Sequence, residues 1–264
     1  MELDALTAIS PIDGRYWDRT RGLARWFSEQ ALMRYRLQVE LAYFTFLCEV
    51  PLEELKGTDL SKIGQVHQRI GELSTSDAQR IKDIEKVTNH DVKAIEYFLK
   101  ERLDEAGFSK QKEFVHFALT SQDINNTALP MLIKDFLYEA YLPALINLRD
   151  RLHGQALEWA RVPMLARTHG QPASPTRVGK ELQVFVERID QQLKLLRDVP
   201  FSGKFGGATG NFNAHHVAYP ELDWVELADR FLLEKLGLAR LQFTTQIDHY
   251  DNLAALFDGI RRIN

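Results

Sequence analysis

The spacing of apolar residues constrains the fold of this chain more than any other feature. Apolar residues recur every three or four positions along most of the sequence, and the alternation typical of half-buried strands is almost absent. This period predicts an all-α protein. With 264 residues, 45% of them hydrophobic, the chain can bury a large core. We expect an N-terminal helical domain over residues 1–110, followed over residues 111–264 by the first part of a bundle of long helices.

Capping residues and helix breakers set the expected ends of these helices. Ser28 is a suitable N-cap for a helix that runs to about Glu49. After an extended segment at Val162–Ala173, Ser174 and Pro175 are expected to cap and begin another helix. The other expected helices cover Leu60–Leu73, Asp77–Lys86, Asp91–Ala106 with a cap at Thr88 or Asn89, Glu113–Ala118, Thr120 or Ser121 to Trp159 with kinks near Pro130 and Pro143, Asp223–Leu236 and His249–Ile263.

The last residues keep the helical spacing and then stop without a glycine cap or a polar tail. Leu253, Leu256, Phe257 and Ile260 lie on one helical face close to the end. We therefore expect the chain to end in the middle of a helix.

Charge and composition argue against several classes of protein. The net charge of -4 and the absence of a basic cluster disfavour nucleic-acid binding. No apolar stretch approaches the roughly 18 residues of a membrane-spanning helix, and the N-terminus does not resemble a signal peptide. Cys48 is the only cysteine, which excludes an internal disulfide. We expect a cytoplasmic protein that binds neither membranes nor nucleic acid.

The string RTHGQPA, residues 167–173, presents a histidine outside any apolar stripe. Gly170 and Pro172 oppose a helix, so the backbone and not core packing is expected to position His169. Imidazole titrates near neutral pH and can donate or accept a proton, which makes His169 a candidate acid or base. The alternative is a surface histidine in a loop rich in proline and glycine.

The string TSQDINN, residues 120–126, is predicted to begin a helix. Free N–H groups and the hydroxyls of Thr120 and Ser121 could hold a carboxylate there. The alternative is an ordinary cap followed by a polar first turn. Asn125 and Asn126 favour a functional interpretation, because paired amides lower helix propensity without adding to the core.

Two further polar groups are candidates for binding a ligand. Asn89, His90 and Asp91 cluster at a predicted helix start, where they could also be only a cap. Arg15 beside Tyr16 could clamp a phosphate, with the guanidinium as a fork and the ring as a stacking surface. An Arg-Tyr pair on an ordinary surface is the alternative.

Some other patterns carry weaker signals. The glycine-rich residues 203–211 lack the spacing of either nucleotide-binding fingerprint, so we expect a tight loop that lines a pocket. Gln246 is a loop amide that could reach either a ligand or solvent. Two pairs of possible metal ligands, His215 with His216 and His249 with Asp251, lack a third ligand at a suitable spacing. We therefore expect no metal, and we also expect no organic cofactor.

Together these strings resemble the fumarase, aspartase and argininosuccinate lyase superfamily. RTHGQPA and TSQDINN mark the superfamily, whereas SPIDGRY and TNHDVKAIEYFLKE indicate its purine-nucleotide branch, and GNFNAH and TTQI follow in the same order. The resemblance implies a homotetramer of long helices in which three subunits build each active site. It also implies fumarate release from adenylosuccinate and from the related carboxamide ribotide of purine synthesis.

Residue by residue, the resemblance implies that His169 is the general acid that protonates the departing nitrogen. It implies that Arg15, Tyr16, Asn89, His90 and Asp91 hold the nucleotide, that Thr120 and Ser121 hold the succinyl carboxylates, and that Gln246 meets another polar group of the substrate.

The catalytic base of this superfamily is a serine on an SSxMPxKxN loop, which we expect beyond Asn264. The resemblance therefore implies that this chain is the N-terminal part of the enzyme, and we expect it to be inactive alone. Two alternatives stay open: another fumarate-forming lyase, such as argininosuccinate lyase or aspartase, and a helical scaffold without catalysis.

Overall fold

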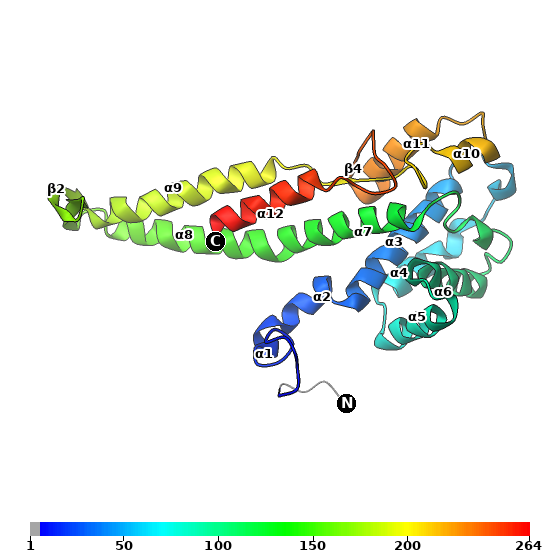
Figure 1. Cartoon of the computed structure of the whole chain (residues 1–264), viewed down its shortest axis with the longest axis horizontal. Helices are drawn as coiled ribbons and strands as arrows, with labels where there is room; N and C mark the ends of the chain where they lie inside the picture. Colours follow the sequence, from blue (N-terminus) through cyan, green and yellow to red (C-terminus); the bar gives the residue numbers. More distant parts are fainter. Residues whose placement is uncertain (1–5) are drawn as a thin grey trace. The chain divides into compact units, whose positions relative to one another are not determined.

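A computed structural model describes residues 6–264 (Figure 1), and the predicted all-α fold is confirmed. The strands in this part of the chain form only two small sheets of two strands each. The chain divides into two compact units, of which unit 1 comprises Met1–Ile133 and Ser202–His249, and unit 2 comprises Lys134–Phe201 and Tyr250–Asn264. The domain boundary expected near residue 110 stays a prediction. None of the helices in residues 6–264 is long and apolar enough to cross a membrane.

Unit 1 is built around helix α3, Glu29–Leu47, whose predicted N-cap is confirmed because the Ser28 side chain accepts a hydrogen bond from the N–H of Ala31. Eleven residues of α3 are buried, which indicates that the helix is surrounded by other elements. It packs against α4, Ile63–Gly71, α5, Thr75–Thr88, and α6, Asp91–Ala106. The main core cluster includes Leu37, Leu41 and Phe44 of α3 together with Val66, Ile70, Ile81, Ile95, Phe98 and Leu99.

The rest of unit 1 consists of short elements and most of α7, Ser121–Phe136, up to Ile133. They are α1, Trp17–Thr20; η1, Arg21–Leu23; α2, Ala24–Phe27; η2, Glu53–Leu55; η3, Leu60–Lys62; η4, Lys112–Phe114; β3, Ser202–Gly203; α10, Asn213–Ala218; α11, Trp224–Arg230; the π-helical η6, Phe231–Leu236; and β4, Ala239–Arg240.

The start of α6 differs from the expected cap at Thr88 or Asn89. Asn89 adopts a left-handed conformation with φ 55° and ends α5, and His90 caps α6 by accepting a hydrogen bond from the N–H of Lys93. Asparagine tolerates the left-handed region, and no glycine separates these two helices. Asn89 therefore takes the role of a C-terminal glycine and leaves the N-cap to His90.

The helix expected at Glu113–Ala118 is reduced to the 3₁₀ turn η4. His116 and Ala118 adopt positive φ values of 61° and 60°, which no right-handed helix accommodates. This non-helical segment leads directly to Thr120 and the start of α7.

The long helical segment expected up to Trp159 is interrupted near its second proline. After α7, which contains Pro130, comes a π-helical turn, η5, Leu137–Tyr141, and then α8, Leu142–Glu158, with Pro143 in its first turn. Proline has no N–H to donate to the preceding turn, so a local change of helical pitch is expected there.

Unit 2 contains α8, α9, Val178–Arg197, and α12, Asp251–Ile263, with a hairpin of β1, Pro163–Thr168, and β2, Gln171–Arg177. The predicted cap at Ser174 and helix start at Pro175 are wrong, because both residues lie in β2, where Pro175 pairs with Leu165. Pro172 and Pro175 both favour an extended residue before them, and β1 supplies the partner strand.

Candidate functional site

The first turn of α7 connects several polar strings of unit 1. Asp123 is fully buried, and its Oδ1 accepts hydrogen bonds from the Lys204 ammonium at 2.7 Å and from the N–H groups of Gly206 and Gly207 at 2.9 and 3.2 Å. Its Oδ2 accepts from the N–H of Thr120 at 2.8 Å. The carboxylate therefore joins the helix start to the glycine-rich loop, and the Lys204 charge offsets the cost of burying it.

The paired amides of TSQDINN are also engaged inside unit 1. The Asn125 carbonyl oxygen accepts a hydrogen bond from Arg36 Nε at 2.8 Å, and that of Asn126 accepts from the N–H of Asp248 at 2.8 Å. Asn126 thereby holds the segment that contains Gln246. These tertiary hydrogen bonds account for two amides that are costly in an isolated helix.

Thr120 and Ser121 retain polar groups that a ligand could use. Both residues are half-buried, and each carries a hydroxyl that can donate or accept a hydrogen bond. They lie at the N-terminal end of a helix of 16 residues, whose first N–H groups and dipole favour an anion. A carboxylate at this point could therefore receive both hydroxyl and backbone donors.

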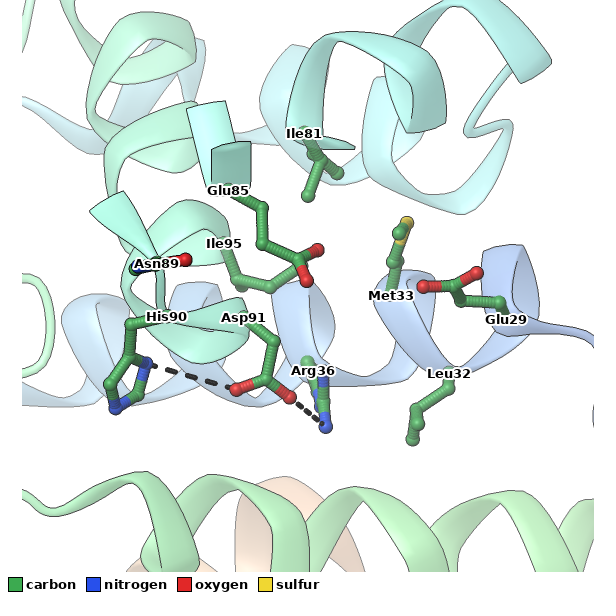
Figure 2. A pocket seen from close by; sticks show the side chains of 10 residues that line it. All are labelled: Glu29, Leu32, Met33, Arg36, Ile81, Glu85, Asn89, His90, Asp91 and Ile95. Carbon is green, nitrogen blue, oxygen red and sulfur yellow. Dashed lines mark ion pairs between the residues drawn. The ribbon is translucent and has the colours of Figure 1, made fainter. Parts of the chain in front are cut away.

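A pocket of about 440 Å³ lies where α3, the end of α5 and the start of α6 meet (Figure 2). Arg36 contributes the positive charge, and it pairs with the Asp91 carboxylate at 2.9 Å. The carboxylates of Glu29 and Glu85 face the same space. The lining residues are Glu29, Leu32, Met33, Arg36, Ile81, Glu85, Asn89, His90, Asp91 and Ile95. The pocket therefore brings together the predicted binding residues Asn89, His90 and Asp91.

The contacts of Asp91 set its charge state. Burial raises the pKa of the Asp91 carboxyl, but the positive charge of Arg36 and the hydrogen bonds that Asp91 accepts outweigh it, so the pKa lies below its usual value. His90 Nδ1 accepts the N–H of Lys93 at 3.1 Å and lies 3.7 Å from Asp91 Oδ1 (Figure 2).

Arg15 and Tyr16 lie close to each other but outside this pocket. Both are exposed, and the Arg15 guanidinium is 5.5 Å from the centre of the Tyr16 ring. This contact is a cation–π interaction that leaves the guanidinium donors in solvent.

Gln246 is an exposed residue of the segment between β4 and α12. The residues around it, among them Thr244 and Asp248, line a second cavity of about 470 Å³ together with Gly210 and Asn211, whereas Gln246 itself is outside that lining. A Cβ atom on Gly210 would lie 2.5 Å from the Thr244 carbonyl oxygen, and the φ of Gly210 is 76°. Only glycine fits this contact, which agrees with the expected tight loop beside a pocket.

His169 belongs to unit 2, where it lies at the tip of the β1–β2 hairpin. Thr168 pairs with Gln171, and the two residues between them, His169 and Gly170, have φ values of 53° and 75°. Positive φ at both central residues is typical of the tightest hairpin turns. The segment is therefore a hairpin, not the single extended stretch expected, and it leaves the imidazole exposed.

The sequence does not reveal contacts between residues that are far apart in the chain but close in the fold. Arg36 is one of them, and the pair of Glu40 and His116 is another: His116 Nδ1 lies 2.5 Å from Oε1 of the fully buried Glu40. His215, considered above only as a possible metal ligand, is a third: Tyr43 Oη lies 3.2 Å from its Nε2, and burial, followed by the charges of His216 and Lys204, lowers its pKa to about 3. A glutamate inside the apolar run of α3 was the one available signal, since a buried carboxylate needs a partner.

Comparison with known proteins gives a consistent set of relatives. The sequence profile of a family described as "Lyase" matches residues 14–264. The chain is 50% identical over its whole length to adenylosuccinate lyase of Dictyostelium discoideum and 42% identical to adenylosuccinate lyase of Escherichia coli strain K12, and it spans 58% of the length of each. Among solved structures, 3-carboxy-cis,cis-muconate lactonizing enzyme of Pseudomonas putida is similar with a TM-score of 0.68 and 21% identity, over 92% of this chain and 52% of that one.

Proposed function

The chain belongs to the lyase family, and from this premise we propose that it is part of an adenylosuccinate lyase. Such an enzyme splits the carbon–nitrogen bond of adenylosuccinate into AMP and fumarate, and it releases fumarate from the related succinylated carboxamide ribotide in purine biosynthesis. The observation that carries the proposal is the 50% and 42% identity to adenylosuccinate lyases over the entire chain.

In the proposed mechanism, His169 is the general acid. A purine amine is a poor leaving group until it is protonated, and imidazole titrates close enough to neutral pH to deliver that proton. The second requirement is to stabilise the negative charge that forms when a proton is removed beside a succinyl carboxylate. The hydroxyls of Thr120 and Ser121 and the first N–H groups of α7 are suited to that carboxylate.

The charges of unit 1 suggest how the nucleotide is divided between two sets of residues. The carboxylates of Asp91, Glu29 and Glu85 make the pocket lined by Arg36 rich in hydrogen-bond acceptors. Such a pocket suits ribose hydroxyls or base amino groups and repels phosphate. The exposed guanidinium of Arg15 suits phosphate, with the Tyr16 ring as a surface beside it. Gln246 is proposed to bind a further polar group of the substrate.

The proposal extends to the partners and location of the complete protein. We propose a cytoplasmic homotetramer that works without a metal or an organic cofactor, whose active sites are shared between subunits and whose ligand is a small nucleotide, not nucleic acid or membrane. Shared sites are a reasonable expectation for His169, because both strands of its hairpin are mostly exposed in this chain.

Fumarate release from adenylosuccinate by the complete protein tests the function. Exchanging His169→Asn should lower kcat by roughly 10²- to 10⁴-fold, the usual contribution of a general acid. A wild-type protein without fumarate release would support the non-catalytic scaffold, whereas a His169→Asn variant with full activity would contradict the role of His169 as general acid.

Binding of AMP separates this function from those of other fumarate-forming lyases. We expect calorimetry to detect AMP binding to the complete protein and to show that Arg15→Ala weakens it, because the proposed phosphate fork is lost. Release of fumarate from argininosuccinate or aspartate without AMP binding would assign the chain to another member of the superfamily.

A further inference from the structure

We propose that Arg36 is a positioning residue that fixes the start of α6 relative to the start of α7. One guanidinium reaches both helices: Nη2 pairs with Asp91 Oδ2 at 2.9 Å, and Nε donates to Asn125 Oδ1 at 2.8 Å. Only 12% of the Arg36 side chain is exposed. The identity of the ligand in this inference rests on the proposed function, whereas the positioning role of Arg36 rests on these two contacts.

The backbone that carries Arg36 is well suited to hold a fixed position. Arg36 lies in the middle of α3, between the buried residues Tyr35 and Leu37, whose side chains are 3% and 0% exposed. Guanidinium is planar and donates in fixed directions, so its two bonds define both the distance and the angle between the helices they join. An ammonium group at the same place could hold either partner but would not define their mutual orientation.

The two helix starts carry different parts of the proposed binding site. His90 and Asp91 begin α6 and line the pocket together with Asn89 at the end of α5, whereas Thr120 and Ser121 lie at the start of α7. If one substrate is held at both places, the span between them must match its length. A displacement of about 1 Å far from the chemistry can cost on the order of 100-fold in rate, so a rigid connection between the two starts has a direct effect on turnover.

The contact with Asp91 gives the proposal a second consequence. Without the positive charge of Arg36, the remaining burial favours the protonated carboxyl, so the pKa of Asp91 rises. In an Arg36→Met variant, the acid limb of the pH profile of kcat/KM should therefore move to higher pH. A residue that only contributes to overall stability would not move this limb.

The test compares four variants of the complete protein with the wild type in the fumarate-release assay. They are Arg36→Lys, Arg36→Met, Asn125→Ala and, as the matched control, Arg102→Lys. Arg102 is buried to a similar degree, with 13% of its side chain exposed, and it pairs with Glu105 at 2.8 Å outside the pocket. Thermal unfolding followed by circular dichroism confirms that each variant is folded.

We expect Arg36→Lys and Asn125→Ala each to lower kcat/KM at least roughly tenfold. A double variant, Arg36→Lys with Asn125→Ala, is added to these four and should lose no more activity than the more impaired of the two single variants, since both changes break one connection. Arg102→Lys should keep the wild-type value. Retained activity in Asn125→Ala with a loss in Arg36→Lys would mean that Arg36 contacts the substrate directly, and it would overturn the positioning role.

Hydrogen exchange supplies a readout that does not depend on activity. Arg36→Lys, but not Arg102→Lys, should accelerate exchange of the amides in the first turns of α6 and α7, because the connection between them is weakened. Unchanged exchange at both helix starts would overturn the proposal even if the enzyme is active. Absence of fumarate release by the wild type, in contrast, would contradict the proposed function and leave the exchange result to decide the role of Arg36.

Discussion

The buried pair of Glu40 and His116 makes the stability of unit 1 depend on pH. Burial alone would lower the pKa of His116, but the negative charge of Glu40 and its hydrogen bond to the ring outweigh this effect, and the pKa is raised. A histidine with a raised pKa in the folded state contributes stability that is fully present below its unfolded pKa of about 6.5. This contribution is lost as the pH rises through the folded pKa.

The first prediction follows from the raised pKa of His116. His116→Gln should lower the free energy of unfolding by about 2 kcal/mol at pH 6, the usual loss for a hydrogen bond to a charged group, and by less at pH 9. Urea denaturation at the two pH values measures the difference. His216→Gln, which changes an exposed histidine, is the control and should show no such trend. An equal loss at both pH values for His116→Gln would contradict the ion pair.

At the scale of single residues, the sequence predicts local chemistry but not distant partners. Thr120, Ser121 and His169 stand out because polar residues at a helix start, or a histidine beside glycine, have few purely structural explanations. The partner of Asn125 is 89 residues away, and that of Asp123 is 81 residues away. Arg36 and Lys204 could not be selected from the sequence, because only the tertiary fold brings them to these positions.

At the scale of elements, the start of α9 illustrates how pairing overrides local signals. Ser174 followed by Pro175 is a typical helix start, yet both residues lie in β2, where Pro175 pairs with Leu165 of β1, and the helix begins at Val178. The pairing is a tertiary effect that the sequence pattern of β2 alone does not reveal. The helices themselves were predictable from their apolar period, although their ends depend on such competition between neighbouring elements.

The junction of α8 and α9 gives the second prediction. A Cβ atom on Gly179 would lie 2.1 Å from the Ala156 carbonyl oxygen and 2.7 Å from the Ala160 nitrogen, both backbone atoms that cannot move independently. Gly179→Ala should therefore destabilise the α8–α9 pair by at least 1–3 kcal/mol, as expected for overpacking. Differential scanning calorimetry would detect a lower melting temperature.

The matched control for this prediction is Gly154 in α8, which has no heavy atom within 4 Å of an added Cβ. Gly154→Ala should be neutral or stabilising by about 0.5–1 kcal/mol, because alanine is the better helix former. Equal melting temperatures for the two variants would contradict the close packing at Gly179.

At the scale of the whole molecule, the apolar period predicts the fold class but not which apolar residues face the interior of one chain. In α9, Phe185 is 52% exposed, whereas Val186 and Leu193 are 0% and 5% exposed. Phe257 of α12 is also 52% exposed. Large apolar side chains that remain exposed in a bundle are typical of surfaces that meet another protein.

The proposed homotetramer provides a cover for these side chains, and it gives the last prediction. Covering a phenylalanine contributes about 1.5–3 kcal/mol, and a charge placed in such an interface adds the cost of its desolvation. Phe185→Glu should therefore raise the dissociation constant of the assembly at least roughly tenfold, which sedimentation velocity over a range of concentrations would measure. Val87→Glu, at a position of α5 that is 87% exposed, carries the same charge change and should leave the assembly intact. If both variants sediment like the wild type, the exposed face of α9 is not where the subunits meet.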